Sequence, residues 1–377
     1  MVFLIKLIDK HVGDLICNVI GIFNKNKLKE IRKVDRILVV QLWGIGETIL
    51  TLPAIEALRR KFPKSEINAL VTARNKDIYF NNKNIGKIIV LKLNPFSINS
   101  FILKNAKKYD LVMDMEEYLN VSAIISFFVG RRVVGYSHNA RAKLYTRRVK
   151  YNDKQHAVQT FLDLVRALDI NYNASRLPEL NFSKNDKNVV DKFFKGSKVK
   201  PNDFVVCVAP GAAESARCRM WPYNRYAELC DELIERHKAR IIFVGALNEI
   251  ELVNKIQNYM EKKTISAAGK LTLSQLFCLI SKSNLFIGND AGPMHVAAAQ
   301  GVKTLGLFGP NLPVRFGPYG EGNTGMYKGY NCEFSPCINV HKGQVPDCLY
   351  PKHSNDYQKC MKNISVNDVL KEVEKLV

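Results

Sequence analysis

Short apolar runs alternate with helical periodicities along the first half of the chain. Four runs consist almost wholly of apolar, mostly β-branched side chains: residues 34–42, 67–71, 88–91 and 111–113. Runs without polar alternation are typical of parallel strands that are buried on both faces. Residues 48–61 have helical spacing and end at Phe62-Pro63, and residues 123–129 predict a further helix. This alternation predicts a parallel sheet with helices on both faces.

A second alternation follows residues 171–185, a polar stretch with a proline that reads as a linker. It predicts strands at 204–208, 240–244, 285–288 and 304–308, and helices at 223–237, 249–261, 272–281, 294–300 and 366–376. A chain of 377 residues is long enough for two such domains. The expected fold class is α/β, with two doubly wound domains facing a cleft, one at 34–180 and one at 181–377.

Residues 1–33 precede the first domain and have a pattern of their own. Apolar side chains recur at helical spacing on one stripe: Leu4, Ile5, Ile8, Val12, Leu15, Ile16, Val19, Ile20 and Phe23. Basic residues follow directly: Lys25, Lys27, Lys29, Arg32 and Lys33. This amphipathic helix either lies on an anionic membrane surface or packs on the protein's own core. A basic n-region and an A-x-A cleavage site are both missing, so the segment does not resemble a signal peptide.

Charge narrows the possible partners of the chain. Lysine and arginine number 56 against 35 acidic residues, a formal charge of +21. Such an excess favours phosphate-rich partners, among them nucleic acid, anionic lipid and phosphorylated glycans. Nucleic acid is not expected, because zinc-finger, RNP and helix-turn-helix signatures are lacking. No apolar run reaches the length that spans a bilayer.

The sequence GNDAGPMHVAAAQGVKTLGLFGP at residues 288–310 carries the strongest chemical signal. A strand leads into Asp290, then into Gly292 and Pro293, then into an alanine-rich helix. The first turn of a helix presents unpaired N–H groups at the positive end of its dipole, and glycine lets a ligand come close. The stretch therefore predicts a diphosphate-binding corner, with Asp290 and His295 beside it.

Two further turns follow predicted strands. The sequence GIGETI at residues 44–49 has only part of a dinucleotide fingerprint, because Ile49 stands where the third glycine would be. Glu47 in this turn is suited to take a proton from an acceptor hydroxyl, or it simply stabilises the helix dipole. The sequence APGAAESARCRMWP at residues 209–222 contains Gly211 and Arg219, and Arg219 is suited to neutralise a diphosphate or remains a solvated charge.

Together, three segments resemble glycosyltransferase family nine, the heptosyltransferase-like enzymes. They are GIGETILTLPAIEALRRKFP, then APGAAESARCRMWP with FVGALNE, then GNDAGPMHVAAAQGVKTLGLFGP. The resemblance covers residues 36–377. It implies a GT-B fold of two Rossmann-like domains, an inverting transfer from a nucleotide sugar, and no requirement for a metal or other cofactor.

The resemblance also implies a role for individual residues. Arg219 matches the basic residue that contacts the donor diphosphate, and Glu249 matches the acid that binds the ribose. The remaining donor-binding positions are Gly211, Asp290, Ala291, Gly292, Met294 and His295. The catalytic base of the family is an aspartate after the G-x-G turn, where this chain has Glu47 next to Gly46. A displaced carboxylate costs up to about 100-fold in rate, so compensation by the backbone, substitution by Asp114 or a weakened enzyme all stay open.

Acceptor contacts are expected from Gly46, Glu47, Asp114 and Arg131. Asp114 belongs to the sequence DMEE after a strand, and an acidic cap is the simpler alternative. Basic residues are dense beyond it: Arg131, Arg132, Arg141, Lys143, Arg147, Arg148, Lys150 and Lys154. They would suit an anionic glycolipid acceptor, or they form a solvated surface.

The nine cysteines fall into two groups. Five are scattered, as in a reduced cytosolic protein. The other four gather near the end of the chain: Cys332, Cys337, Cys348 and Cys360. Structural zinc is possible there, but a C-x2-C pair is missing, so buried thiols or a disulfide are the alternatives.

From the sequence we expect transfer of a heptose or similar sugar from a nucleotide donor, with ADP expected, to a lipopolysaccharide-type glycolipid or another surface glycan. The enzyme would act in the cytoplasm, on the inner face of the plasma membrane. Alternatives are a non-catalytic homologue that binds nucleotide sugars at the membrane, and a GT-B nucleotide-sugar epimerase.

Overall fold

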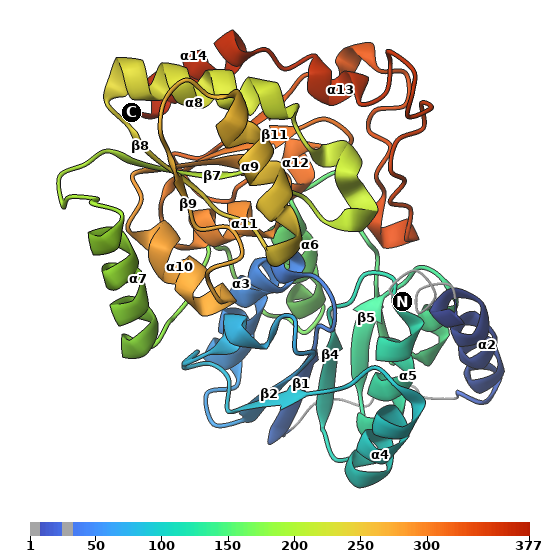
Figure 1. The fold of residues 1–377 in the computed structure, drawn as a ribbon. Coiled ribbons are helices and arrows are strands. Elements are labelled where there is room, and N and C mark those ends of the chain that lie inside the picture. The colour runs from blue at the N-terminus through green and yellow to red at the C-terminus, as the bar shows by residue number, and fades with distance from the viewer. Residues whose placement is uncertain (1–7, 25–32) are drawn as a thin grey trace. The chain divides into compact units, whose positions relative to one another are not determined.

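The computed structural model describes residues 8–24 and 33–377, which divide into two compact units (Figure 1). Unit 1 is Met1–Ala174 and unit 2 is Ser175–Val377. The boundary lies a few residues before the one expected at residue 180. The reason is that Leu180 already packs with unit 2, since its N–H donates to Gln300 Oε1 at 3.0 Å and its carbonyl accepts from Gln300 Nε2 at 3.1 Å.

Unit 1 is built on a parallel six-stranded sheet. Its strands are β1 (Arg36–Val40), β2 (Glu66–Val71), β3 (Lys87–Val90), β4 (Leu111–Asp114), β5 (Val133–Tyr136) and β6 (Arg147–Val149). The strand order is β3-β2-β1-β4-β5-β6, so the chain begins in the middle of the sheet. From β1 it winds first toward β3 and then, from β4, toward β6. The topological switch point therefore lies between β1 and β4.

Helices cover the sheet of unit 1 and fill its loops. They are η1, a π-helix (Asp9–Gly13), α2 (Asp14–Phe23), α3 (Ile45–Lys61), η2 (Lys76–Tyr79), α4 (Pro95–Asn105), α5 (Asn120–Val129), η3 (Ala140–Leu144) and α6 (Ala157–Arg166). Helices α3 and α6 pack on each other. Helices α2, α4 and α5 share one apolar cluster with the central strands, to which Leu38 and Val112 contribute. The N-terminal helix is thus part of unit 1.

Unit 2 repeats the plan with its own sheet. The strands are β7 (Val205–Ala209), β8 (Arg240–Phe243), β9 (Ile265–Ser266), β10 (Leu285–Asn289), β11 (Lys303–Phe308) and β12 (Thr324–Tyr327). All pairs are parallel, in the order β12-β11-β10-β7-β8-β9. The switch point here lies between β7 and β10. The predicted α/β class, with two doubly wound parallel sheets, is confirmed.

The helices of unit 2 are α7 (Lys184–Gly196), η4 (Glu214–Arg219), α8 (Tyr223–His237), η5 (Leu247–Glu249), α9 (Ile250–Tyr259), α10 (Leu273–Ser281), α11 (Gly292–Ala299), α12 (Pro313–Phe316), η6 (Gly329–Asn331), η7 (Val340–Lys342), α13 (Lys359–Lys362) and α14 (Val366–Leu376). Helices α7, α10 and α14 begin with capping boxes, in which side chains satisfy the first N–H groups. By contrast, no side chain of the described residues caps α3 or α11. Their first N–H groups are left for other partners.

Candidate functional site

The predicted donor-binding residues of unit 2 gather at the carboxyl ends of three adjacent strands. Gly211 follows β7, Glu249 follows β8 and Asp290 follows β10. Because β10, β7 and β8 are neighbours and run parallel, the turns after them lie at one edge of the sheet. This edge is at the switch point, where open α/β sheets bind their ligands. We call these three turns, with Arg219 and the start of α11, the donor corner.

Asn289 ties the donor corner together, and the sequence analysis missed it. Its Nδ2 donates to the carbonyls of Pro210 and Gly211 at 2.7 and 3.2 Å. Its Oδ1 accepts from the Trp221 N–H and from the Tyr226 hydroxyl, each at 3.0 Å. These four bonds use the whole capacity of the amide. The signal in the sequence is an asparagine at the end of an otherwise apolar strand, where burial demands partners.

Arg219 and Asp290 form an ion pair in the donor corner. Arg219 Nη1 lies 3.3 Å from Asp290 Oδ2 and also donates to the Asp290 carbonyl at 3.1 Å. Asn311 Nδ2 donates to the same Asp290 oxygen at 2.9 Å. Arg219 Nε is buried and has no hydrogen-bond partner among the described residues. The guanidinium is therefore fixed in direction while its hydrogen-bonding capacity is only partly used.

Glu249 lies against two glycines. A Cβ atom on Gly211 would come 1.8 Å from Glu249 Oε1, and one on Gly245 would come 2.9 Å from Oε2. The carboxylate accepts the Ala246 N–H at 2.7 Å, which fixes its position. Burial raises the pKa of Glu249 above its ordinary value, and the bond from Ala246 partly offsets this. Glycine at 211 is thus what leaves room for the carboxylate.

Helix α11 completes the corner with an uncapped N-terminus. Ala291 is the N-cap residue and its side chain accepts nothing, while Pro293 has no N–H to satisfy. Met294 and His295 are buried, and Met294 Sδ fills the space beside Gly306. Backbone N–H groups at the positive end of a helix dipole attract anions. Glycine at 292 keeps side-chain bulk away from this end.

In unit 1, Glu47 lies in the first turn of α3, directly after the carboxyl end of β1. Gly44 is the N-cap residue, and the Thr48 hydroxyl and N–H both bond to its carbonyl. A Cβ atom on Gly44 would come 1.7 Å from Glu47 Oε2, so the carboxylate folds back over this glycine. Gly46 is buried inside the same turn. The carboxylate therefore lies at the switch point of the first sheet.

Glu116 is a second carboxyl group at this edge, and the sequence analysis gave it no role. It is 2% exposed, and it accepts the N–H of Leu42, which leads into the Gly44 turn. Burial raises the pKa of Glu116 to about 8, and the nearby negative charges of Asp114 and Glu47 add to the rise. At neutral pH the carboxyl group is thus mostly protonated. It links the end of β4 to the turn that carries Glu47.

Asp114 is fully buried rather than open to an acceptor. Its Oδ2 accepts from Arg141 Nη2 at 2.9 Å, from the Tyr145 hydroxyl at 2.7 Å and from the Ser122 hydroxyl at 3.0 Å. Neither Asp114 nor Arg141 exposes any side-chain surface. The expected acceptor contact of Asp114 is therefore replaced by an internal ion pair. Arg141 likewise leaves the basic surface that the sequence suggested.

This ion pair predicts a loss of stability for Asp114→Ala. The variant leaves the Arg141 charge buried without its partner, which costs about 3–5 kcal/mol in the free energy of unfolding. Asp191→Ala is the matched control, because its pair with Lys282 at 2.8 Å is partly exposed and is expected to be worth at most about 1 kcal/mol. Urea denaturation measures both. Equal stability of the two variants would show that the buried pair has no special weight.

Arg131 does not reach the edge that carries Glu47. It precedes β5, and it pairs with Asp110, which precedes β4, at 3.3 Å. In a parallel sheet these positions mark the amino-terminal edge, so the expected acceptor contact of Arg131 is corrected. Arg74, which follows β2, is exposed at the carboxyl edge, with its guanidinium 5.4 Å from the centre of the Trp43 ring. The sequence analysis overlooked it because a lone arginine after a strand carries no motif.

The cysteines near the end of the chain are thiols. All nine cysteines are free, and Cys332 and Cys360 are buried in the core of unit 2. Burial raises the pKa of Cys337 to about 11 and that of Cys360 to about 12. Within residues 8–24 and 33–377, no group of three or more His, Cys, Asp or Glu side chains is placed to hold a metal ion. Structural zinc at Cys332, Cys337, Cys348 and Cys360 stays an untested prediction.

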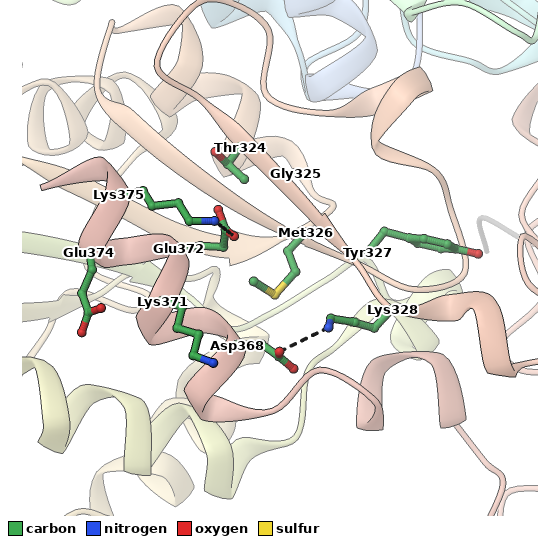
Figure 2. A pocket seen from close by; sticks show the side chains of 10 residues that line it. All are labelled: Thr324, Gly325, Met326, Tyr327, Lys328, Asp368, Lys371, Glu372, Glu374 and Lys375. Atoms are coloured by element: carbon green, nitrogen blue, oxygen red, sulfur yellow. Dashed lines mark hydrogen bonds and ion pairs between the residues drawn. The ribbon is translucent and has the colours of Figure 1, made fainter.

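A hollow of about 570 Å³ lies elsewhere on unit 2, between β12 and α14 (Figure 2). Three basic and three acidic side chains line it, so their charges balance, and Lys328 lies 3.2 Å from Asp368 while Lys375 lies 2.6 Å from Glu372. None of its lining residues belongs to the donor corner. Charge that is balanced inside the protein leaves little attraction for an ionic ligand, so this hollow is not the donor site.

The chain is similar to proteins of known families. Residues 103–342 match the model of glycosyltransferase family 9 (heptosyltransferase). The lipopolysaccharide core heptosyltransferase OpsX of Haemophilus influenzae is 23% identical over 289 residues, which are 74% of this chain and 81% of that protein.

Three solved structures, of two proteins, are similar over nearly their whole length. A glycosyl transferase family 9 protein from Veillonella parvula has a TM-score of 0.76 at 25% identity, covering 91% of this chain and 97% of that one. The E. coli heptosyltransferase WaaC with ADP has a TM-score of 0.64 at 16% identity, covering 91% and 100%. The same enzyme with ADP-2-deoxy-2-fluoro heptose has a TM-score of 0.61 at 17% identity, with the same coverage.

Proposed function

The chain belongs to glycosyltransferase family 9, the heptosyltransferases, and we propose that it transfers heptose from ADP-heptose to a lipopolysaccharide-type glycolipid. The resemblance found in the sequence and the assignment as a glycosyltransferase are confirmed by the family match. The observation that carries the proposed reaction is the donor corner. It brings a fixed arginine, a carboxylate and an uncapped helix N-terminus to the switch point of one sheet.

The donor corner suits two parts of an ADP-sugar, the diphosphate and the ribose. The N–H groups at the start of α11 and the Arg219 guanidinium would hold the diphosphate. Glu249, whose carboxylate is fixed by the Ala246 N–H, would accept the ribose hydroxyls. Asp290 would keep Arg219 oriented through the ion pair at 3.3 Å. These assignments agree with the roles that the family resemblance implies.

The transfer would be a single displacement with inversion. The Glu47 carboxylate takes the proton of the acceptor hydroxyl, and the acceptor oxygen forms a bond to the anomeric carbon. The bond between that carbon and the diphosphate oxygen breaks at the same time, and its electron pair leaves with ADP. Arg219 and the α11 N–H groups stabilise the negative charge that develops on the departing group.

The acceptor would be an anionic glycolipid. Arg74 is exposed at the same sheet edge as Glu47. It is suited to contact the phosphate or carboxylate groups of the acceptor. The nucleobase, the sugar and the acceptor hydroxyl are each open to direct measurement. The alternatives are transfer to another surface glycan, a non-catalytic homologue and a GT-B epimerase. The nucleotide-binding and turnover experiments described next distinguish them.

The test is thermal stabilisation by nucleotides. ADP at about 100 times its dissociation constant should stabilise the native state by about 2.7 kcal/mol, with smaller effects from UDP, GDP and CMP. Gly211→Ala should abolish most of the shift, because its Cβ atom would displace the Glu249 carboxylate. Gly196→Ala is the control, since a Cβ atom there meets nothing within 4 Å.

Turnover is then measured with ADP-heptose. Release of ADP that requires an added glycolipid supports the transferase. Donor binding without turnover would favour a non-catalytic homologue, and conversion of the sugar nucleotide without acceptor would favour the epimerase. A shift with UDP or GDP in place of ADP would contradict the proposed donor.

A further inference from the structure

The N-terminal helix of unit 1 has two apolar faces of different kinds. Its inner face is lined by the small residues Gly13, Cys17 and Gly21. A Cβ atom on Gly13 would come 2.7 Å from Asn120 Cβ, and one on Gly21 would come 2.6 Å from Lys143 Cβ. Small side chains thus let the helix backbone approach α5 and η3 closely. These small residues, together with Ile20, which packs on the core cluster, join the helix to unit 1.

The large apolar side chains point away from the protein. We call them the outer apolar face: Ile8, Val12, Leu15, Ile16, Val19 and Ile22. Leu15 is 64% exposed and Ile22 is 74% exposed. Of the stripe expected from the sequence, Ile8, Val12, Leu15, Ile16 and Val19 are exposed, so the alternative in which it packs on the protein's own core is wrong for these five. Ile20 does pack on the core cluster, and Leu4 and Ile5 lie outside the described residues. A stripe of this size in water is typical of a surface that is covered in use.

The acidic groups of the helix are turned inward. The Asp9 carboxylate accepts the N–H groups of Asn120 and Val121 at 2.9 and 2.8 Å, where it caps α5. Asp14 Oδ1 accepts from Asn120 Nδ2 at 3.0 Å. Lys10, by contrast, is exposed. The two carboxylates of the helix are thus occupied at the start of α5, while Lys10 is left as an exposed positive charge.

Neighbouring helices extend the same combination of apolar and basic groups. Helix α4 exposes Phe96 by 84% and Leu103 by 70%, and α5 exposes Phe128 by 38%. Helices α2, α4 and α5 all pack on one core cluster of unit 1, and α5 contacts both of the others (Figure 1). Lys104 in α4 and Lys108 just after it are exposed, while the Lys107 ammonium donates to the carbonyls of Phe127 and Gly130. The sequence has no acidic residue between Asp77 and Asp110.

We propose that the outer apolar face docks unit 1 on an anionic phospholipid bilayer. A helix that exposes large apolar side chains, with exposed lysines on it and on α4, matches the acyl and headgroup layers of such a surface. Charge complementarity favours this occupant over a second copy of the chain, because two copies would bring like charges together. No helix in the described ranges is long and apolar enough to cross a bilayer, so the contact is interfacial.

This inference deepens the proposed function, since a glycolipid acceptor lies in a bilayer. It is tested without the reaction by co-sedimentation with vesicles of phosphatidylethanolamine and phosphatidylglycerol, and with phosphatidylcholine vesicles for comparison. The double variant L15Q/I22Q should bind the anionic vesicles at least about tenfold more weakly, because two apolar side chains no longer insert. Added salt should weaken binding of the wild type.

Two controls keep the test sharp. Leu349→Gln changes a side chain of unit 2 that is 53% exposed and should bind vesicles as the wild type does. Circular dichroism and the Tm of L15Q/I22Q should be unchanged, because both side chains are exposed. Equal vesicle binding by this variant and the wild type would overturn the inference. The inference would also be overturned if the wild type were a dimer, and if the two substitutions dissociated this dimer without changing vesicle binding.

Turnover separates this inference from the proposed reaction. With a deacylated, water-soluble acceptor, L15Q/I22Q should retain wild-type kcat, because both side chains are exposed and neither belongs to the Gly44 turn or to the donor corner. Vesicle binding without any transferase activity in the wild type would refute the reaction and leave the docking surface standing. Transferase activity without vesicle binding would refute the docking surface and leave the proposed reaction standing.

Discussion

Replacing Glu47 by glutamine should lower kcat by about 10²–10⁴-fold, which is the contribution of a positioned general base. The amide keeps the size of the side chain but cannot take the proton of the acceptor hydroxyl. The structure holds this carboxylate over Gly44 at the start of α3, so the loss should arise from chemistry and not from a disturbed fold. Steady-state kinetics with ADP-heptose and a glycolipid acceptor measure the effect.

Glu56→Gln is the matched control for this prediction. Glu56 lies in the same helix and pairs with Arg60 at the surface, at 2.9 Å, so its loss should leave kcat within about twofold. ADP binding by Glu47→Gln should equal that of the wild type, because the proposed donor contacts are all in unit 2. Wild-type kcat in Glu47→Gln would eliminate Glu47 as the base.

Glu47→Asp asks whether the longer side chain has been accommodated. If the Gly44 turn places the glutamate correctly, the shortened carboxylate should be misplaced and the rate should fall, by up to about 100-fold. A rise in rate would instead show an enzyme weakened by the glutamate. Absence of turnover in both forms, with intact donor binding, would favour a non-catalytic homologue.

Replacing Arg219 by methionine should lower kcat by about 10²–10³-fold, since a charge that stabilises the leaving diphosphate is lost. The methionine fills part of the space but offers no donor to the diphosphate or to the Asp290 carbonyl. Arg217→Met is the matched control. It lies in the same short helix, its side chain is 64% exposed and its Nη2 lies 3.9 Å from Glu214 Oε1, so its loss should be nearly neutral.

The division of the Arg219 effect between kcat and KM reveals its role. An interaction that strengthens in the transition state lowers kcat and kcat/KM together, whereas uniform binding raises KM alone. Arg219→Lys should recover only part of the rate, because an ammonium group lacks the planar fork of the guanidinium. An effect on KM alone would assign Arg219 to ground-state binding.

Much of the fold and of the donor corner could be predicted, because parallel buried strands have continuous apolar sequences. The strands that end near Ala209 and Gly288 can be recognised in the sequence. Because the carboxyl ends of parallel strands meet at one edge of a sheet, Gly211 and Asp290 are then expected to lie together. The arrangement that fixes these residues was less accessible. Asn289 contacts residues 63–79 positions away, and such long-range partners leave no local pattern.

In unit 1, sequence patterns do not show at which edge of the sheet a residue lies or how deeply it is buried. Arg131 was expected beside Glu47 because β5 and β6 had not been recognised, and without them its place at the amino-terminal edge could not be known. Asp114 was expected to be accessible, but its partner Arg141 lies 27 residues away. The amphipathic N-terminal helix was recognised, although the sequence did not reveal that its small residues face inward.

Each sheet consists of strands from one continuous stretch of the chain, β1–β6 within the first 174 residues and β7–β12 within the remainder. Unit 1 can therefore complete its core while unit 2 is still being synthesised, since domains generally fold as units during synthesis. The proposed membrane-docking helix belongs to unit 1, which is synthesised before unit 2. Folding at the membrane surface during translation is thus compatible with this order of strands.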